Sequence, residues 1–115
     1  MPEFNGFPAG SNDSIPVPEA FFTNLLTVID DLGEMRVTLY AFWSFSGQVK
    51  EPRYLRYDDI LKDSQLMASF GVTDDEQAAG LADGLRRACA RGTLLEARVE
   101  EKLYYFLNCE QGKAA

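Results

Sequence analysis

Large apolar side chains recur at intervals of three and four along residues 16–30. That spacing places them on one side of an α-helix, as the buried stripe of an amphipathic helix requires. Pro18 suits the first turn of this helix, because its missing N–H would be unpaired there anyway. We therefore expect a first helix here, with an apolar stripe of Phe21, Phe22, Leu25, Leu26 and Ile29.

Residues 31–47 also predict a helix, but its apolar side chains occupy most of the circumference. Asp31 and Glu34 have the spacing of an N-terminal capping box, with Asp in the usual Ser/Thr place, and Gly47 is suited to end the helix. A helix that is apolar on nearly every side has to be covered on nearly every side. Two interpretations stay open: a central core helix, or a helix that also faces a second subunit. The apolar residues are Met35, Val37, Leu39, Tyr40, Phe42, Trp43 and Phe45.

Three further elements are predicted between residues 53 and 92. Residues 53–57 alternate in the manner of a short strand, and residues 58–71 predict a helix in two pieces that meet around Asp63. Thr73 and Glu76 then form a capping box at the start of a longer helix. The apolar stripe of that helix is Ala78, Leu81, Ala82, Leu85, Ala88 and Cys89, and Gly92 ends it.

The last patterned segment is a β-hairpin made of residues 93–99 and 102–108. Its turn is Glu100–Glu101, although neither residue is the Gly or Asn that tight turns prefer. The order helix, helix, short strand, helix, helix, strand, strand predicts an α+β domain. We expect a mostly helical winged helix-turn-helix with an extra N-terminal helix and a C-terminal β-hairpin wing.

This domain is expected to span residues 15–110, between a flexible arm at 1–14 and a frayed tail at 111–115. The arm is rich in Pro, Gly and small polar residues, and Phe4 and Phe7 are its only large apolar side chains. Either the arm is a disordered tail, or these two rings dock on a partner or a neighbouring subunit.

Composition narrows the possible chemistry. The chain has 115 residues, 46% of them hydrophobic, which is enough for one compact domain. It contains no histidine, so a Cys/His zinc site and histidine-based acid–base catalysis are excluded. No nucleophile-elbow, phosphate-binding or dinucleotide-binding glycine pattern occurs, and paired acids fit helix starts. We expect a non-enzyme without cofactor or metal.

Two cysteines, Cys89 and Cys109, allow either one disulfide or two free thiols, and free thiols suit a reducing cytosol. The N-terminal residues lack the basic region and apolar run of a signal peptide. No apolar run approaches the roughly 18 residues that cross a bilayer. These features favour a cytoplasmic protein without membrane contact.

Several segments taken together resemble the N-terminal domain of DnaD-type primosomal, or helicase-loading, proteins. They are "IPVPEAFFTNLLTVIDDLGEMRVTLYAFW", "PRYLRYDDIL", "ARGTLLEA" and "LYYFLN", with "GFPAG" in the arm. The resemblance implies a winged-helix domain whose additional N-terminal element mediates self-association, acting as a protein-interaction platform in the initiation of DNA replication. In such proteins a separate C-terminal domain carries most of the DNA binding. The chain is then a fragment of a longer protein or a stand-alone relative, with weak or no direct DNA binding.

Charge also argues against a DNA-binding surface. The formal net charge is −7, whereas affinity for phosphates needs clustered Lys and Arg. The helix that would enter the major groove begins with Asp74, Asp75 and Glu76, and the wing ends in two glutamates. The alternative, a nucleic-acid-binding winged helix such as a transcriptional regulator, would use Arg53, Arg56, Arg86, Arg87, Arg91 and Arg98.

Our principal hypothesis from the sequence is therefore a protein-interaction module that forms a homo-oligomer, a dimer or larger, and binds replication proteins. Gly80 and Gly84, four apart on the helix face expected to be exposed, either are tolerated there or admit close approach by another chain. The expected interface residues are Phe4, Phe7, Phe21, Phe22, Leu25, Tyr40 and Trp43, with Tyr104 and Phe106 on the outer face of the strands.

Overall fold

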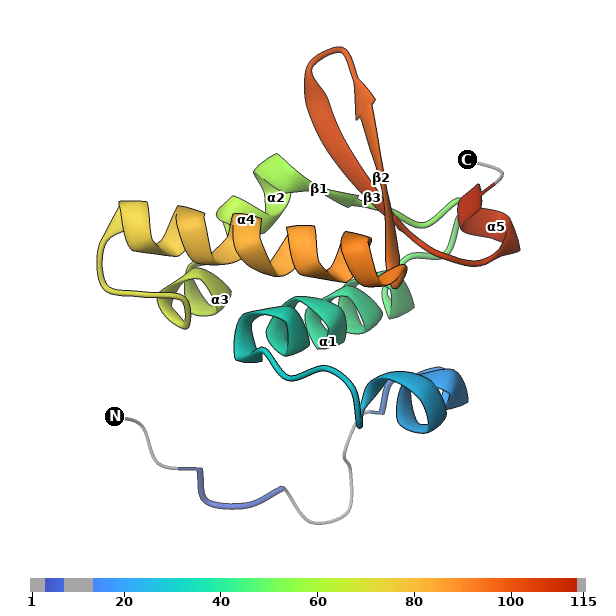
Figure 1. Ribbon diagram of the computed structural model, residues 1–115, viewed down its shortest axis with the longest axis horizontal. Helices are drawn as coiled ribbons and strands as arrows, with labels where there is room; N and C mark the ends of the chain where they lie inside the picture. The colour runs from blue at the N-terminus through green and yellow to red at the C-terminus, as the bar shows by residue number, and fades with distance from the viewer. Residues whose placement is uncertain (1–3, 8–13, 114–115) are drawn as a thin grey trace.

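The structure is a computed structural model that describes residues 4–7 and 14–113 (Figure 1). Most of the arm expected at 1–14 lies outside the described residues. In chain order the elements are η1 (Phe21–Leu25), α1 (Leu32–Ser46), β1 (Leu55–Arg56), α2 (Tyr57–Leu61), α3 (Ser64–Ala68), α4 (Asp74–Arg91), β2 (Leu94–Val99), β3 (Lys102–Leu107) and α5 (Glu110–Lys113).

The N-terminal helical segment is wound more loosely than the α-helix that the sequence predicts. η1 is π-helical, and the backbone N–H of Leu26 donates to the carbonyl of Phe21 at 2.7 Å. α1 then begins as expected, because the Asp31 carboxylate accepts from the backbone N–H of Glu34 at 2.9 Å. The reciprocal half of the predicted capping box is wrong. The Glu34 side chain is buried and pairs with Arg91 of α4 instead.

The middle of the chain follows the local signals closely. The helix predicted at 58–71 is divided in two, and Asp63 caps the second piece by accepting from the backbone N–H of Leu66 at 3.0 Å. The capping box of Thr73 and Glu76 is confirmed at the start of α4. Gly92 ends that helix in the left-handed region, at a φ of 94° that L side chains rarely adopt. The strand expected at 53–57 is shorter, because Tyr57 already begins α2.

Three antiparallel strands form the sheet, in the order β1–β3–β2. The hairpin forms around Glu100–Glu101 as predicted, and the structure sets its register, with Val99 opposite Lys102 on either side of the turn. Glu100 and Glu101 have φ values of 52° and 67°, so both occupy the left-handed region that a two-residue type I′ turn requires. The tail expected to be frayed from residue 111 is instead helical as far as Lys113, in α5.

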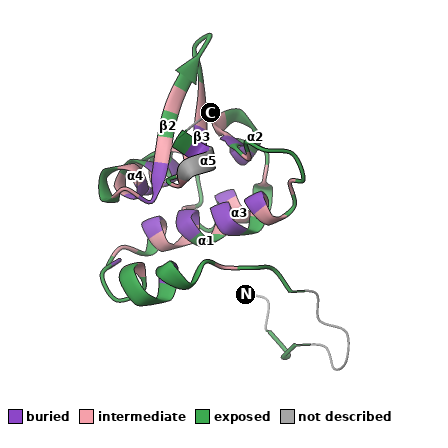
Figure 2. Ribbon diagram, turned by 90° about the vertical axis from the view of Figure 1, so that its right-hand side faces the viewer, coloured by how far each residue is buried: buried purple, intermediate pink, exposed green. Residues whose placement is uncertain are grey.

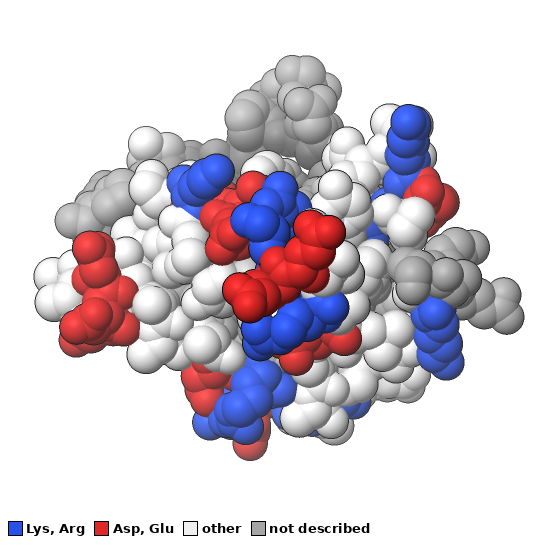
Figure 3. All heavy atoms as spheres, turned by 90° about the horizontal axis from the view of Figure 1, so that it is seen from above, with Lys and Arg blue, Asp and Glu red and all other residues white. Residues whose placement is uncertain are grey.

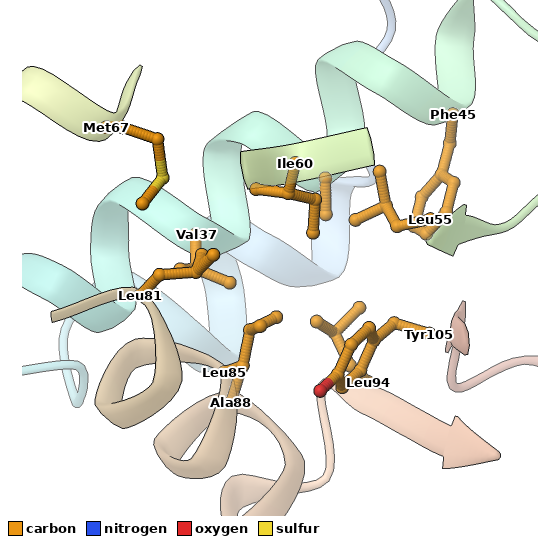
Figure 4. Close-up of a cluster of buried hydrophobic side chains, with 11 residues drawn as sticks. Val37, Phe45, Leu55, Ile60, Met67, Leu81, Leu85, Ala88, Leu94 and Tyr105 are labelled. Carbon is orange, nitrogen blue, oxygen red and sulfur yellow. The ribbon is translucent and has the colours of Figure 1, made fainter. Parts of the chain in front are cut away.

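The helices and the sheet enclose one main core (Figure 4). α1 lies between α4 on one side and the N-terminal segment on the other, while the β2–β3 hairpin rises from the opposite side of α4 (Figure 1). Side chains from both long helices, from the two short helices and from all three strands meet between them. The principal ones are Val37, Ala41, Phe45, Leu55, Ile60, Met67, Leu81, Leu85, Ala88, Leu94 and Tyr105.

Two glycines allow α4 to approach its neighbours closely. A Cβ on Gly84 would lie 2.8 Å from the carbonyl oxygen of Gly33 and 2.8 Å from Cγ2 of Val37, both in α1. A Cβ on Gly80 would lie 2.8 Å from Cβ of Phe70. The exposed face expected for both glycines is therefore wrong, because Gly84 is buried and Gly80 half-buried, and the close approach at each occurs within this chain.

These elements confirm an α+β domain that is mostly helical, with an extra N-terminal helical segment and a C-terminal β-hairpin. Burial follows the layers: the faces of α1 and the hairpin base that turn inward are buried, whereas the N-terminal segment is largely exposed (Figure 2).

Candidate interaction surface

α1 is apolar on two opposite sides, and only one of them is buried. Its inner side packs into the core, whereas Leu32, Leu39 and Trp43 on the outer side are 62%, 42% and 55% exposed. With Arg36 between them, these positions are spaced 4–3–4, so they line one stripe along the helix. Of the two interpretations left open by the sequence, the central core helix is observed, and the contact with a second subunit stays a prediction that this exposed apolar side would allow.

The N-terminal segment covers one flank of α1 and extends its apolar surface. Phe21 packs on Phe42 with ring centroids 5.8 Å apart, and Ile29 completes this small second core. The same segment leaves Phe22 53% and Leu26 45% exposed. The prediction that Phe21 belongs to the interface is therefore wrong, because its side chain is only 3% exposed and packs against Phe42 within this chain.

A shallow hollow of about 500 Å³ lies between Ile15, which precedes η1 in the chain, and the C-terminal end of α1. Ile15, itself 41% exposed, lines this hollow with Trp43 and with small or polar residues at the C-terminus of α1. We refer to six exposed residues of α1 and the N-terminal segment as the outer apolar surface. They are Ile15, Phe22, Leu26, Leu32, Leu39 and Trp43.

The remaining predicted interface residues fall into different surroundings. Phe4 and Phe7 pack edge to face with centroids 4.9 Å apart and are 73% and 80% exposed. Leu25 is half-buried beside the small second core. The Tyr40 hydroxyl donates to Asp63 at 3.0 Å, and burial together with this carboxylate raises the pKa of Tyr40 to about 12.

Tyr104 and Phe106 lie on the outer face of the sheet, as expected for alternate positions of β3. Tyr54 joins them, with centroids 5.5 Å from Tyr104 and 6.4 Å from Phe106. The guanidinium of Arg56 lies 5.9 Å from the centre of the Tyr104 ring. This aromatic face is separate from the outer apolar surface, because it is built on β1 and β3 rather than on α1.

Most of the arginines proposed for nucleic acid are already paired within the chain. Arg86 and Arg87 each bond Asp83 at 2.7 Å, and Arg53 pairs with Glu51 at 3.2 Å. Of the other arginines in this nucleic-acid hypothesis, Arg91 pairs with the buried Glu34, and Arg98 is exposed on β2. On the side toward which the hairpin points, the basic and acidic side chains of the described residues are interleaved, and these residues form no continuous basic patch there (Figure 3).

Both cysteines are free thiols. Burial, with a smaller contribution from the Glu96 carboxylate, raises the pKa of the Cys89 thiol to about 11. The same two causes raise the pKa of Tyr105, whose hydroxyl donates to Glu96 at 3.1 Å. Such groups stay neutral near pH 7, which suits packing rather than nucleophilic chemistry.

Within residues 4–7 and 14–113, no three His, Cys, Asp or Glu side chains are grouped so as to hold a metal ion. Among the helices of these described segments, none combines the length and apolar character that crossing a bilayer requires. Comparison with protein-family models, with curated proteins and with solved structures found no match to this chain.

The sequence did not single out Ile15, Leu26, Leu32 or Leu39 as candidates for the interface. Leu26 and Leu39 belong to the apolar patterns of the two predicted helices, but a pattern that covers most of a helix does not say which side stays uncovered. The 4–3–4 spacing of the α1 stripe was a usable signal, since such a seam commonly faces another helix.

Proposed function

We propose that this chain is a winged-helix domain for self-association and protein interaction, of the kind found in DnaD-type replication initiation proteins. The element order of α1, β1, α2, α4 and the β2–β3 hairpin supports the winged-helix assignment, and so does the strand order β1–β3–β2. In that assignment α4 is the second helix of the helix-turn-helix and the hairpin is the wing. The replication setting rests on the sequence resemblance.

One observation carries the interaction role: the outer apolar surface. Single exposed apolar side chains are ordinary, but an apolar stripe along α1 whose Trp43 lines one hollow with the exposed Ile15 is not. Trp43, at the C-terminal end of this stripe, is a large, amphipathic ring of the type that dominates binding energy at protein interfaces. A second copy of the same chain covers this stripe most simply, because matching 4–3–4 seams pack side by side.

The charge distribution supports protein rather than DNA as the partner. The first turn of α4 carries Asp74, Asp75 and Glu76, which favour the helix dipole and oppose phosphate. The arginines at the other end of α4 are held by Asp83 and Glu34. The domain in this proposal is non-catalytic, needs no cofactor and binds DNA weakly or not at all.

Sedimentation velocity over a range of concentrations tests the proposal. The wild-type chain should associate as concentration rises, and Trp43→Glu should weaken that association by at least tenfold, because it places a charge in an apolar contact. Val72→Glu is the matched control, since Val72 is 93% exposed in the loop before α4 and away from this surface. A wild-type chain that stays monomeric at every concentration would contradict the proposal.

A further inference from the structure

A second surface that could bind another chain is the edge of β2 that does not face β3. Because the strand order is β1–β3–β2, β2 has a partner on one side only among the residues that the structure describes. The hairpin rises clear of the helices toward its turn (Figure 1), and Glu96, Arg98 and Val99 in that part of β2 are exposed. An exposed strand edge presents unpaired N–H and C=O groups to any strand that can align with it.

The turn determines which residues of β2 present these groups. Residues on either side of a two-residue turn form a hydrogen-bonded pair, and bonded pairs alternate with non-bonded pairs along the ladder. Val99 and Lys102 are therefore a hydrogen-bonded pair. The backbone N–H of Asn108 donates to the carbonyl of Thr93 at 3.1 Å, and Thr93 lies six residues before Val99, so it belongs to the same alternating set of bonded pairs. Odd-numbered residues of β2 thus turn their backbone groups toward β3. The groups of Leu94, Glu96 and Arg98 face the open edge.

We infer that β2 pairs antiparallel with β2 of a second copy of this chain, about a two-fold axis at Ala97. This register sets Glu96 opposite Arg98 of the second copy, and Arg98 opposite its Glu96. Both residues direct their backbone groups to the open edge, so the two strands can form a regular ladder between them. The result is a six-stranded sheet that crosses the two-fold axis.

Neighbouring registers are disfavoured by the same residues. A shift of one position would set residues with free backbone groups opposite residues already bonded to β3. A shift of two positions would set Glu96 opposite its own copy in one direction, or Arg98 opposite its own copy in the other. Charge therefore selects the register with its axis at Ala97.

The other face of the strand agrees with this pairing. In the inferred register Leu95 lies opposite Val99 of the second copy, and Ala97 lies opposite its own counterpart. These side chains share the outer face of the sheet with Tyr104 and Phe106, because Ala97 pairs with Tyr104 and Leu95 with Phe106. The apolar outer face would then continue from one copy into the other without a charged residue between them.

Charged side chains on an edge strand usually prevent such pairing. Here the two charged residues, Glu96 and Arg98, are opposite in sign and two positions apart. A two-fold axis at Ala97, midway between them, therefore sets each one opposite a residue of opposite charge in the second copy. One oxygen of Glu96 accepts from the Tyr105 hydroxyl at 3.1 Å, which holds the carboxylate in place on this side of the strand.

This surface is separate from the outer apolar surface and rests on the proposed function only for the identity of the partner, a second copy. With two different self-association surfaces, one chain can join two neighbours at once, and copies can therefore assemble beyond a dimer.

Two charge-reversal variants test the pairing. Glu96→Arg alone sets arginine opposite arginine, and Arg98→Glu alone sets glutamate opposite glutamate, so each variant should lose the β2 association. In an equimolar mixture every pair is again of opposite charge, and association between the two variants should return to within about threefold of the wild-type affinity. Sedimentation velocity or native mass spectrometry measures all three samples, and circular dichroism verifies that both variants fold.

Lys102→Glu is the control for Arg98→Glu, because it makes the same change in net charge on β3 rather than on the open edge. A mixture that behaves as the average of the two separate variants would overturn the inference. If the charge variants have no effect but Trp43→Glu still weakens association, the β2 pairing fails and the proposed function stands. If the charge variants weaken association but Trp43→Glu does not, the β2 pairing stands and the proposed role of the outer apolar surface fails.

Hydrogen exchange of single amides provides a second readout. The N–H groups of Glu96 and Arg98 should become protected as concentration rises, because only the second copy supplies their acceptors. Those of Leu95 and Ala97 should be protected at every concentration, because they bond β3. Exchange at Glu96 and Arg98 that does not change over the range of self-association would overturn the inference.

Discussion

Arg91, in the last turn of α4, donates two hydrogen bonds to the carboxylate of Glu34, in the first turn of α1. They run from Nε to Oε2 at 2.6 Å and from Nη2 to Oε1 at 3.1 Å. The Glu34 side chain is 1% exposed and that of Arg91 is 29% exposed. Each charge also suits the helix end at which it lies, an acid at the start of α1 and a base at the end of α4.

We predict that breaking this pair from either side destabilises the domain unequally. Glu34→Gln should lower the free energy of unfolding by about 1–3 kcal/mol, because a charged hydrogen-bonded pair is lost. Arg91→Gln should cost more, since it leaves a buried carboxylate without a counter-charge. Denaturant unfolding of both single variants and the double variant measures this difference.

The double variant should be more stable than the sum of the two losses implies, because the second change removes the orphaned charge. Arg86→Gln is the control, because Arg86 pairs with Asp83 on the exposed side of the same helix and should change stability little. Strictly additive losses in the double variant would contradict a direct coupling of Glu34 and Arg91.

Gly84→Ala should destabilise the domain although alanine is the better helix former. Alanine gains about 1 kcal/mol in helix propensity. Its Cβ would, however, lie 2.8 Å from the carbonyl oxygen of Gly33, a backbone atom that moves only with α1. We expect a net loss of about 1–3 kcal/mol, as for overpacked cores. Thermal unfolding measures it against Ala79→Gly, an exposed change on α4 that tests propensity alone. A more stable Gly84→Ala protein would refute the close helix contact.

Replacing Glu100–Glu101 by Asn-Gly should stabilise the hairpin. Both glutamates are held at positive φ, where Asn and Gly are better tolerated in a type I′ turn. The expected gain in the free energy of unfolding is about 1–2 kcal/mol. The variant Glu100→Gln/Glu101→Gln separates the two possible causes, because it removes the charges and keeps the backbone conformation. An equal gain in both variants would attribute the effect to charge repulsion instead.

Stability should also depend on pH through Glu76. Hydrogen bonds from the backbone of Thr73 and Val72, and from the Thr73 hydroxyl, lower the pKa of this carboxyl from 4.5. A depressed pKa in the folded state stabilises the fold above the unfolded pKa, and that contribution is lost as pH falls through the folded value. Glu76→Gln should therefore lower the melting temperature by a few degrees at pH 7, with the difference shrinking at acid pH. A difference that stays constant from pH 7 to pH 3 would contradict this role.

Much of the fold is encoded in short stretches of sequence. The caps at Asp31, Asp63 and Thr73 and the left-handed Gly92 are local features, because each is decided by side chains and backbone within a few residues. The hairpin and its two-residue turn were predictable for the same reason, even with unfavourable turn residues. The π-helical winding of η1 had no such local signal.

The candidate surface was only partly predictable. Sequence reasoning selected Phe22 and Trp43, which are exposed, but also Phe21, which is buried, and it omitted Leu32 and Leu39. Phe21 and Phe22 are adjacent and identical in type, so the sequence pattern does not say which of the two is buried. Their fates differ because Phe42 of α1 covers only one of them.

The sequence alone determined the helix caps at Asp31, Asp63 and Thr73, the helix end at Gly92, the position of the hairpin turn, and how charge is distributed along the chain. Only the tertiary structure decided that Gly84 admits α1, that Glu34 bonds Arg91 and that one apolar side of α1 stays uncovered. The physical reason is that caps and turns involve residues near in sequence, whereas burial and pairing depend on which distant side chains the packing brings into contact.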